Sequence, residues 1–188
     1  MKAGANPPLW SPPVWACFAW GLAEAAFFFI IPDVILSWAS LTGVRNGVRA
    51  LGAILAGALA GGSLMYAWAA RAPDASIAAV AKVPFVRAKM FETVSRGYAV
   101  HGLAGMLRGP GSGIPYKVYT VLAPPRGNLA EFLALSIPAR IERLALSWVV
   151  FTAAGILLRN RMPAHRATTA ALFAAFWIAV YAIYWSRI

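Results

Sequence analysis

The sequence contains one cysteine, Cys17, and two histidines, His101 and His165, among its 188 residues. A single cysteine cannot form an internal disulfide, and it cannot build a cysteine-based metal cluster. The two histidines are far apart and have no neighbour at a metal-ligand spacing, so we expect no metal site. The glycine-rich stretch around residues 109–113 is not followed by Gly-Lys-Ser/Thr, which argues against a nucleotide site. We therefore expect no cofactor.

Charged residues are also scarce, at 12% of the chain, and acids are fewest, with 6 Asp+Glu against 17 Lys+Arg. Soluble domains are about a quarter charged, so this composition excludes an ordinary cytosolic enzyme. With 61% hydrophobic residues and a mean hydropathy of +0.67, the sequence predicts an all-α integral membrane protein of one domain, 1–188. The length leaves no room for a large catalytic domain beside the membrane segments, so we expect no enzymatic activity.

Three stretches have the composition of transmembrane helices, namely 48–70, 144–158 and 167–187. The segment 71–96 instead mixes basic and apolar residues, which predicts an amphipathic helix on the membrane surface, kinked at Pro84. The net charge of +11 is then explained by loops that face anionic lipid, without a nucleic-acid partner. By the positive-inside rule, the side that carries 71–96 is cytoplasmic.

Close helix packing is predicted in the first of these crossings, where Gly57, Gly61 and Gly62 lack side chains. Small residues let the backbone of a neighbouring helix approach closely. The last crossing instead ends in aromatic residues of the kind that anchor helices at a membrane interface: Trp177, Tyr181, Tyr184 and Trp185.

Two further apolar segments, 9–43 and 98–125, are each interrupted by a proline. The first contains Ile31-Pro32-Asp33 and the second contains Ile114-Pro115-Tyr116-Lys117. Proline removes a backbone donor and disfavours helix in the preceding residue. Irregular backbone within a membrane persists only where protein or water covers it. We therefore expect two re-entrant helical hairpins, arranged as an inverted repeat and facing each other or a cavity.

The two hairpins carry opposite charges. Glu24 and Asp33 lie in the first, and Arg108 and Lys117 lie in the second. A charge at bilayer depth costs about 2.5–3.5 kcal/mol on insertion scales, so we expect the acids and bases to neutralise each other. Burial raises the pKa of a carboxyl group and a nearby cation lowers it, which makes Glu24 and Asp33 candidates for proton coupling.

Each of these residues also has a purely structural interpretation. Glu24 could form an ion pair that only holds the hairpins together. Asp33 could cap the half-helix that follows Pro32. Lys117 could extend to a membrane interface without binding a ligand.

Two strings resemble motifs of the DedA family, in particular its YqaA-like branch with the SNARE-associated or VTT domain. The first is EAAFFFIIPDVIL from Glu24 to Leu36, and the second is SGIPYKVYT from Ser112 to Thr120. The resemblance covers about residues 15–158. It implies opposed re-entrant hairpins and a role in moving lipids such as undecaprenyl phosphate or phosphatidylethanolamine across a membrane, coupled to protons or other ions.

The resulting hypothesis is a lipid translocase in a bacterial inner membrane, with membrane lipids and protons as partners. We expect Lys117, with Arg108 or Arg140, to receive the lipid phosphate, Arg143 to be a further candidate, and the Tyr116 hydroxyl to donate to the same group. Two alternatives stay open: a proton-coupled carrier of a small ion or osmolyte, and a scaffold that transports nothing. The sequence leaves open whether several copies assemble.

Overall fold

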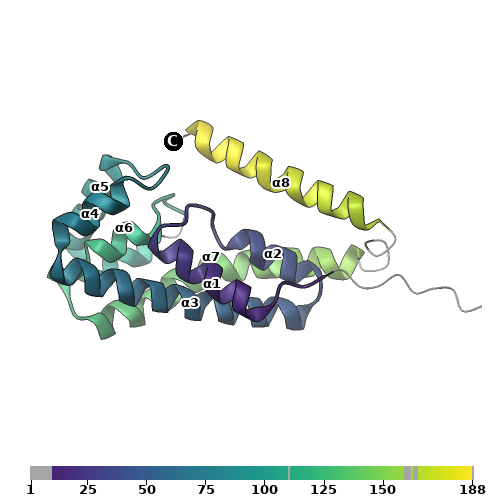
Figure 1. The fold of residues 1–188 in the computed structure, drawn as a ribbon, viewed down its shortest axis with the longest axis horizontal. Coiled ribbons are helices and arrows are strands. Elements are labelled where there is room, and N and C mark those ends of the chain that lie inside the picture. Colours follow the sequence, from purple (N-terminus) through teal and green to yellow (C-terminus); the bar gives the residue numbers. More distant parts are fainter. Residues whose placement is uncertain (1–9, 110, 159–161, 163–164, 188) are drawn as a thin grey trace, which may run out of the picture.

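The computed structural model describes residues 10–109, 111–158, 162 and 165–187. Positions 9 and 110, which belong to the two expected hairpins, lie outside the described residues, as do 1–8, 159–161, 163–164 and 188. The described part of the chain is helical and contains no strand (Figure 1). In chain order the elements are α1 (Val14–Ala26), α2 (Asp33–Leu41), α3 (Val44–Arg71), α4 (Pro73–Ala81), α5 (Ala88–His101), the 3-10 helix η1 (Gly102–Arg108), α6 (Tyr116–Val121), the 3-10 helix η2 (Pro124–Arg126), α7 (Leu129–Leu158) and α8 (Arg166–Arg187).

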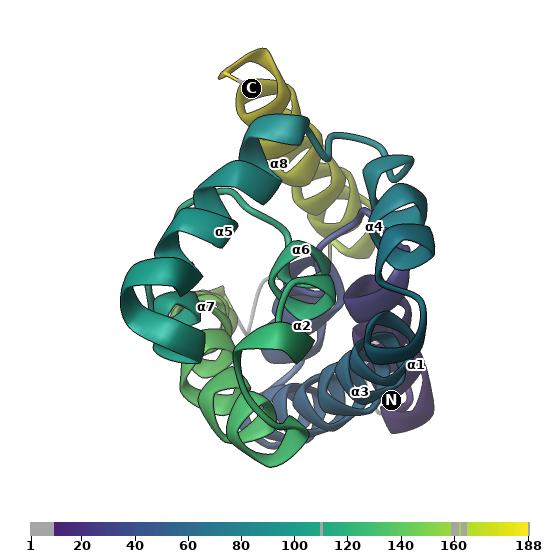
Figure 2. The same cartoon turned by 90° about the vertical axis from the view of Figure 1, so that its left-hand side faces the viewer.

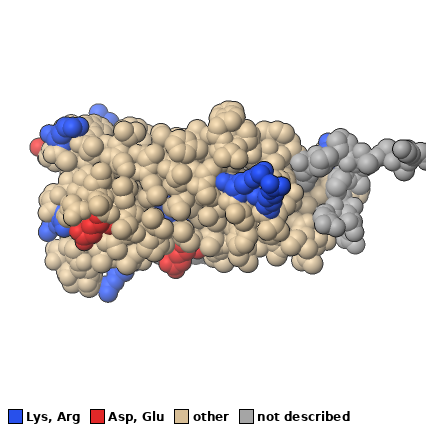
Figure 3. Space-filling model, turned by 90° about the horizontal axis from the view of Figure 1, so that it is seen from below, with Lys and Arg blue, Asp and Glu red and all other residues tan. Residues whose placement is uncertain are grey.

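In the described part of the chain, three helices, α3, α7 and α8, are long and apolar enough to cross a membrane. Within the apolar windows of α3, α7 and α8, 50%, 17% and 6% of the residues are buried, so α8 is the most exposed of the three. One face of the molecule accordingly shows wide uncharged tracts between small charged patches (Figure 3).

The second long helix differs from the sequence-based expectation, because α7 begins at Leu129 and not at Leu144. It continues through Pro138, although this residue lacks a backbone donor. Arg140 and Arg143, which the sequence analysis placed before the crossing, therefore lie inside the helix. Both arginines have carboxylate partners there, which offsets the cost of placing them among apolar residues.

Helices α1 and α3 pack with their backbones in close contact, as the small residues of α3 predicted. A Cβ atom at Gly57 would collide with the carbonyl group of Phe18, and one at Gly61 would lie 2.5 Å from the carbonyl oxygen of Leu22. Gly62 allows the close approach of a different element, α6, since a Cβ atom there would lie 2.6 Å from the hydroxyl oxygen of Tyr116. Glycines in this helix therefore position both α1 and α6.

The first predicted break is present between α1 and α2. The helix α1 ends where the amides of Phe27 and Phe28 both donate to the carbonyl of Ala23, and α2 begins directly after Pro32. The chain reverses direction across this break (Figure 1). Asp33 does not cap α2, because its Oδ1 accepts a hydrogen bond from Ser147 of α7 at 2.6 Å.

The second break resembles the first only after its proline, where α6 starts at Tyr116. Before it, the expected apolar half-helix is replaced by the end of α5 and by η1. Gly102, the first residue of η1, directly follows α5 with φ = 57°, a left-handed conformation that glycine adopts without strain. All six residues of α6 are buried. The helix lies between other helices near the middle of the view in Figure 2.

The amphipathic segment 71–96 forms two helices, α4 and α5, and not one kinked helix. Proline disfavours helix in the residue before it, and the break at Pro84 also contains Phe85 with φ = 68°. The segment is otherwise two-faced as predicted, since Val80 and Val94 are buried and all its basic residues are exposed: Arg71, Lys82, Arg87, Lys89 and Arg96.

Candidate functional site

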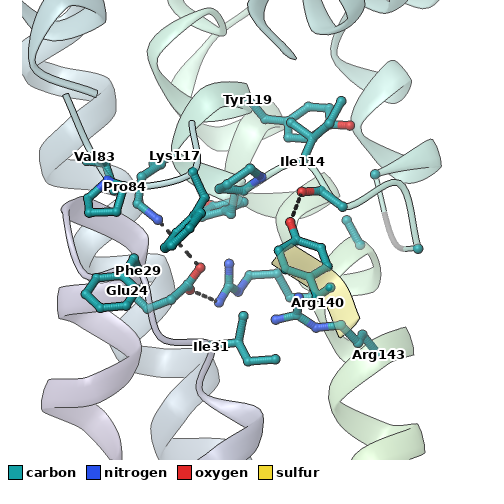
Figure 4. Close-up of a pocket in the computed structure, with 18 of the residues that line it drawn as sticks. Glu24, Phe29, Ile31, Val83, Pro84, Ile114, Lys117, Tyr119, Arg140 and Arg143 are labelled. Carbon is teal, nitrogen blue, oxygen red and sulfur yellow. Dashed lines mark hydrogen bonds and ion pairs between the residues drawn. The ribbon is translucent and has the colours of Figure 1, made fainter. Parts of the chain in front are cut away.

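A cavity of about 320 Å³ lies where the two proline breaks meet (Figure 4). Phe29 and Ile31 of the first break line it, and so do Ile114 and Pro115 of the second. The lining also includes residues of α1, the α4–α5 connection, η1, α6, α7 and α8, so segments from both halves of the chain enclose one space.

Glu24 of α1 lies at the centre of the charges in this cavity and is only 4% exposed. Its Oε2 accepts a hydrogen bond from Arg140 Nη2 of α7 at 2.5 Å. Its Oε1 lies 3.9 Å from the Nζ of Lys117 in α6. One carboxylate is thus shared by two cations from different helices (Figure 4).

Lys117 connects the two breaks directly. It is 1% exposed, and its Nζ donates to the carbonyl oxygen of Phe28 at 3.3 Å. That carbonyl belongs to the irregular backbone between α1 and α2. An ammonium group has three protons, so it can serve Phe28, Glu24 and one further acceptor.

Arg140 packs against the ring of Tyr116. The guanidinium carbon lies 4.5 Å from the centroid of the Tyr116 ring, which is a cation–π distance. The Tyr116 hydroxyl, which the sequence analysis expected to donate to a ligand, donates to Ser136 of α7 at 2.8 Å in this structure. The Nε of Arg140 is buried and has no hydrogen-bond partner in the described part of the chain, so it could donate to a ligand.

A second ion pair lies beside the first. Arg143 of α7 approaches Asp33 Oδ2 at 3.1 Å, and Asp33 itself is 2% exposed. The side chain of Arg143 is 43% exposed and lines the cavity, so the pair runs from the protein interior to the cavity wall. Ser147 binds the other oxygen of Asp33.

Most of the candidates from the sequence come together, with Arg108 as the exception. Glu24, Lys117, Arg140 and Arg143 line the cavity together with Tyr116, and Asp33 adjoins it through Arg143. Arg108 is exposed at the end of η1 and is not among the residues that line the cavity. Of these two arginines, Arg140 therefore lines the cavity and Arg108 does not.

Two cavity residues had a different interpretation at the level of sequence. Tyr181 and Tyr184 of α8 were expected to be interface anchors, but both line the cavity. Ser147, which donates a hydrogen bond to Asp33, was not among the expected site residues. The sequence did contain a pattern that indicates Ser147, because Arg140, Arg143 and Ser147 are spaced by three and four residues and therefore share one face of a helix.

Three cations and one carboxylate line the cavity among the described residues, so its chemistry favours an anion. In the same part of the chain, no cluster of three or more His, Cys, Asp or Glu is suited to a metal ion. Searches against protein-family models, curated proteins and solved structures give no match to this chain.

Proposed function

We propose that this protein is a membrane lipid translocase that moves a phosphate-bearing lipid, such as undecaprenyl phosphate or phosphatidylethanolamine, with coupling to protons. The observation that carries the proposal is the sharing of Glu24 between Lys117 and Arg140 in a cavity bordered by both proline breaks. Such a site holds two buried cations close together, and an incoming phosphate is an equivalent partner for both.

The proposed placement puts α3, α7 and α8 across the bilayer and makes the two proline breaks the turns of re-entrant hairpins. In support, discontinuous helices at corresponding places in two halves of a chain commonly mark a transporter site near the midplane. Two polar groups of the irregular backbone of residues 27–32 also have protein partners, because Lys117 donates to the Phe28 carbonyl and Tyr181 accepts the amide proton of Ile31.

The proposed binding step is an exchange of partners. In the absence of ligand, Glu24 neutralises the two cations. A phosphate then takes the place of the carboxylate, with Arg140 able to hold two of its oxygens and Lys117 acting as a compact charge. Because the two cations always have an anionic partner, the exchange leaves no unpaired cation at bilayer depth.

Proton coupling follows from the same exchange. A carboxylate that loses both cations to a phosphate is buried and unpaired, and such a group takes up a proton. Release of the lipid restores the ion pairs and returns the proton. Asp33, paired with Arg143 beside the cavity, is the second candidate for proton coupling.

The resemblance of the two motifs to the DedA family supports the lipid as the transported class. The alternative of a small ion or osmolyte uses the same charges with another substrate. The alternative of a scaffold is favoured by one observation, namely that both oxygens of Glu24 are already engaged. Replacement of a buried ion pair by apolar residues of similar volume is often neutral for stability. A scaffold should therefore tolerate apolar replacement of Glu24, Lys117 and Arg140, whereas a transporter should fold but lose transport.

The test is lipid translocation in liposomes that contain the purified protein and labelled undecaprenyl phosphate or phosphatidylethanolamine. A triple variant, Glu24→Leu with Lys117→Met and Arg140→Met, removes the buried charges, and a control removes the exposed charges of Lys82, Arg87 and Glu92. We expect transport by the wild type and the control, and a folded but inactive triple variant. Translocation no faster than in empty liposomes, or full activity of the triple variant, would contradict the proposal.

A further inference from the structure

The helix α8 contacts both proline breaks through two tyrosines. Tyr181 Oη accepts a hydrogen bond from the amide of Ile31 at 2.8 Å, directly before Pro32. Tyr184 Oη donates to the carbonyl of Gly113 at 2.7 Å, two residues before Pro115. The tyrosines are three residues apart and therefore lie on one face of the helix. One helix thus joins the two breaks across the cavity that they border.

The two halves of α8 are held by different kinds of contact. In the part of α8 up to Trp177, Phe173 and Trp177 pack against the ring of Phe151 in α7, with centroid distances of 6.2 and 6.3 Å. Trp177 also donates to Ser37 of α2 at 3.1 Å and is 8% exposed. The last turns form hydrogen bonds through the two tyrosine hydroxyls, and the side chains of Val180, Tyr181 and Tyr184 border a cavity instead of a packed core.

The outer face of α8 is apolar and open. Leu172, Ile178 and Ile183 are 66%, 69% and 56% exposed, whereas Val180 and the two tyrosines face the cavity. The helix α8 lies at the outside of the helix assembly (Figures 1 and 2). In the membrane placement proposed above, its last turns therefore separate the cavity from the hydrocarbon of the bilayer.

We propose that residues 178–184 of α8 form a lateral gate, and that Tyr181 and Tyr184 are positioning residues that hold it closed. When the two hydroxyl bonds break, the end of α8 tilts about its aromatic attachment to α7 and opens the cavity toward the bilayer. A ligand that arrives this way is an amphiphile, because its apolar chain can remain among lipids while its anionic group reaches Lys117 and Arg140. This inference rests on the proposed membrane placement of α8, but not on the identity of the lipid.

The test measures access to the cavity by thiol labelling in liposomes. Ala139→Cys places a small thiol on the cavity wall, and the buried Cys17 stays in the protein as an internal monitor of folding. The labelling reagents are an apolar maleimide that partitions into the bilayer and a charged maleimide that does not. The gate variants are Tyr181→Phe and Tyr184→Phe, singly and together.

We expect each gate substitution to increase the rate at which the apolar reagent labels the thiol at position 139 by about two- to tenfold, because each removes one hydrogen bond. The charged reagent should gain little. The control is Tyr66→Phe, which removes a hydroxyl bond to the carbonyl of Gly127, away from α8. An unchanged rate in the double variant, an equal gain for the charged reagent, an equal gain in the control or a matching rise at Cys17 would overturn the gate. Lipid transport is not measured here, so a failed gate and a failed transport function give separate results.

Discussion

Glu24 and Arg140 are 116 positions apart in the sequence, yet the guanidinium group of Arg140 donates to the Glu24 carboxylate at 2.5 Å. This contact joins the end of α1 to the middle of α7. With Lys117, it places two cations around one buried carboxylate, on which the proposed exchange with phosphate depends.

The first prediction concerns Glu24 as the proton carrier. Glu24→Gln keeps an oxygen that can accept from Arg140 but removes the titrating group, so the protein should fold while its transport loses the pH dependence of the wild type. The measurement is the rate of lipid translocation in liposomes across a range of pH. Glu92→Gln, at an exposed position on α5, is the control and should keep the wild-type profile. A wild-type profile in Glu24→Gln would remove this carboxylate from coupling.

Substitution of Asp33 should have a different effect from substitution of Glu24, since Arg143, the partner of Asp33, is partly exposed. Asp33→Asn leaves Arg143 without its carboxylate and should impair transport or alter its pH response, because Arg143 lines the cavity. Ser147→Ala is the matched variant, since it removes the hydrogen bond to Asp33 and keeps the ion pair. If Asp33→Asn and Ser147→Ala have the same small effect in the translocation assay, the role of Asp33 is structural.

A prediction on stability tests the packing of α3 independently of function. At Gly57 a Cβ atom would meet the backbone of Phe18, which cannot move aside, whereas at Gly52 it would meet nothing within 4 Å. Gly57→Ala should therefore destabilise the protein by about 1–3 kcal/mol or more through overpacking. Gly52→Ala should be neutral or stabilise it by up to about 1 kcal/mol. Thermal unfolding in detergent compares the two, and equal stabilities would contradict the described contact between α1 and α3.

The orientation in the membrane follows from the basic residues around α4 and α5. The positive-inside rule predicts that Lys89 is cytoplasmic and that Arg45, at the opposite end of α3, is outside. Single cysteines at these two exposed positions, treated in intact cells with an impermeant maleimide, test this prediction. Cysteine at position 45 should react and cysteine at position 89 should not, and the reverse result would invert the topology.

The breaks at Pro32 and Pro115 were predictable because proline acts on its immediate neighbours. The ion pairs were only partly predictable. Paired acids and bases were expected because an unpaired charge within a membrane is unfavourable in free energy. Which arginine contacts Glu24 depends on the long-range packing of α7, and this packing brings Arg140, and not Arg108, to Glu24. The role of α8 could not be predicted either, because the spacing of its tyrosines is equally compatible with a membrane interface and a cavity wall.

The most direct test of the account is the binding of lipid phosphate to the purified protein, with Lys117→Ala compared against the wild type. A charge-assisted contact contributes about 1.5–3 kcal/mol, so we expect Lys117→Ala to weaken affinity roughly ten- to a hundredfold. Lys117→Arg should retain part of the affinity, and Lys82→Ala, at an exposed site outside the cavity, should retain all of it. Equal affinities for the wild type and a folded Lys117→Ala protein would place the phosphate elsewhere and contradict the proposed site.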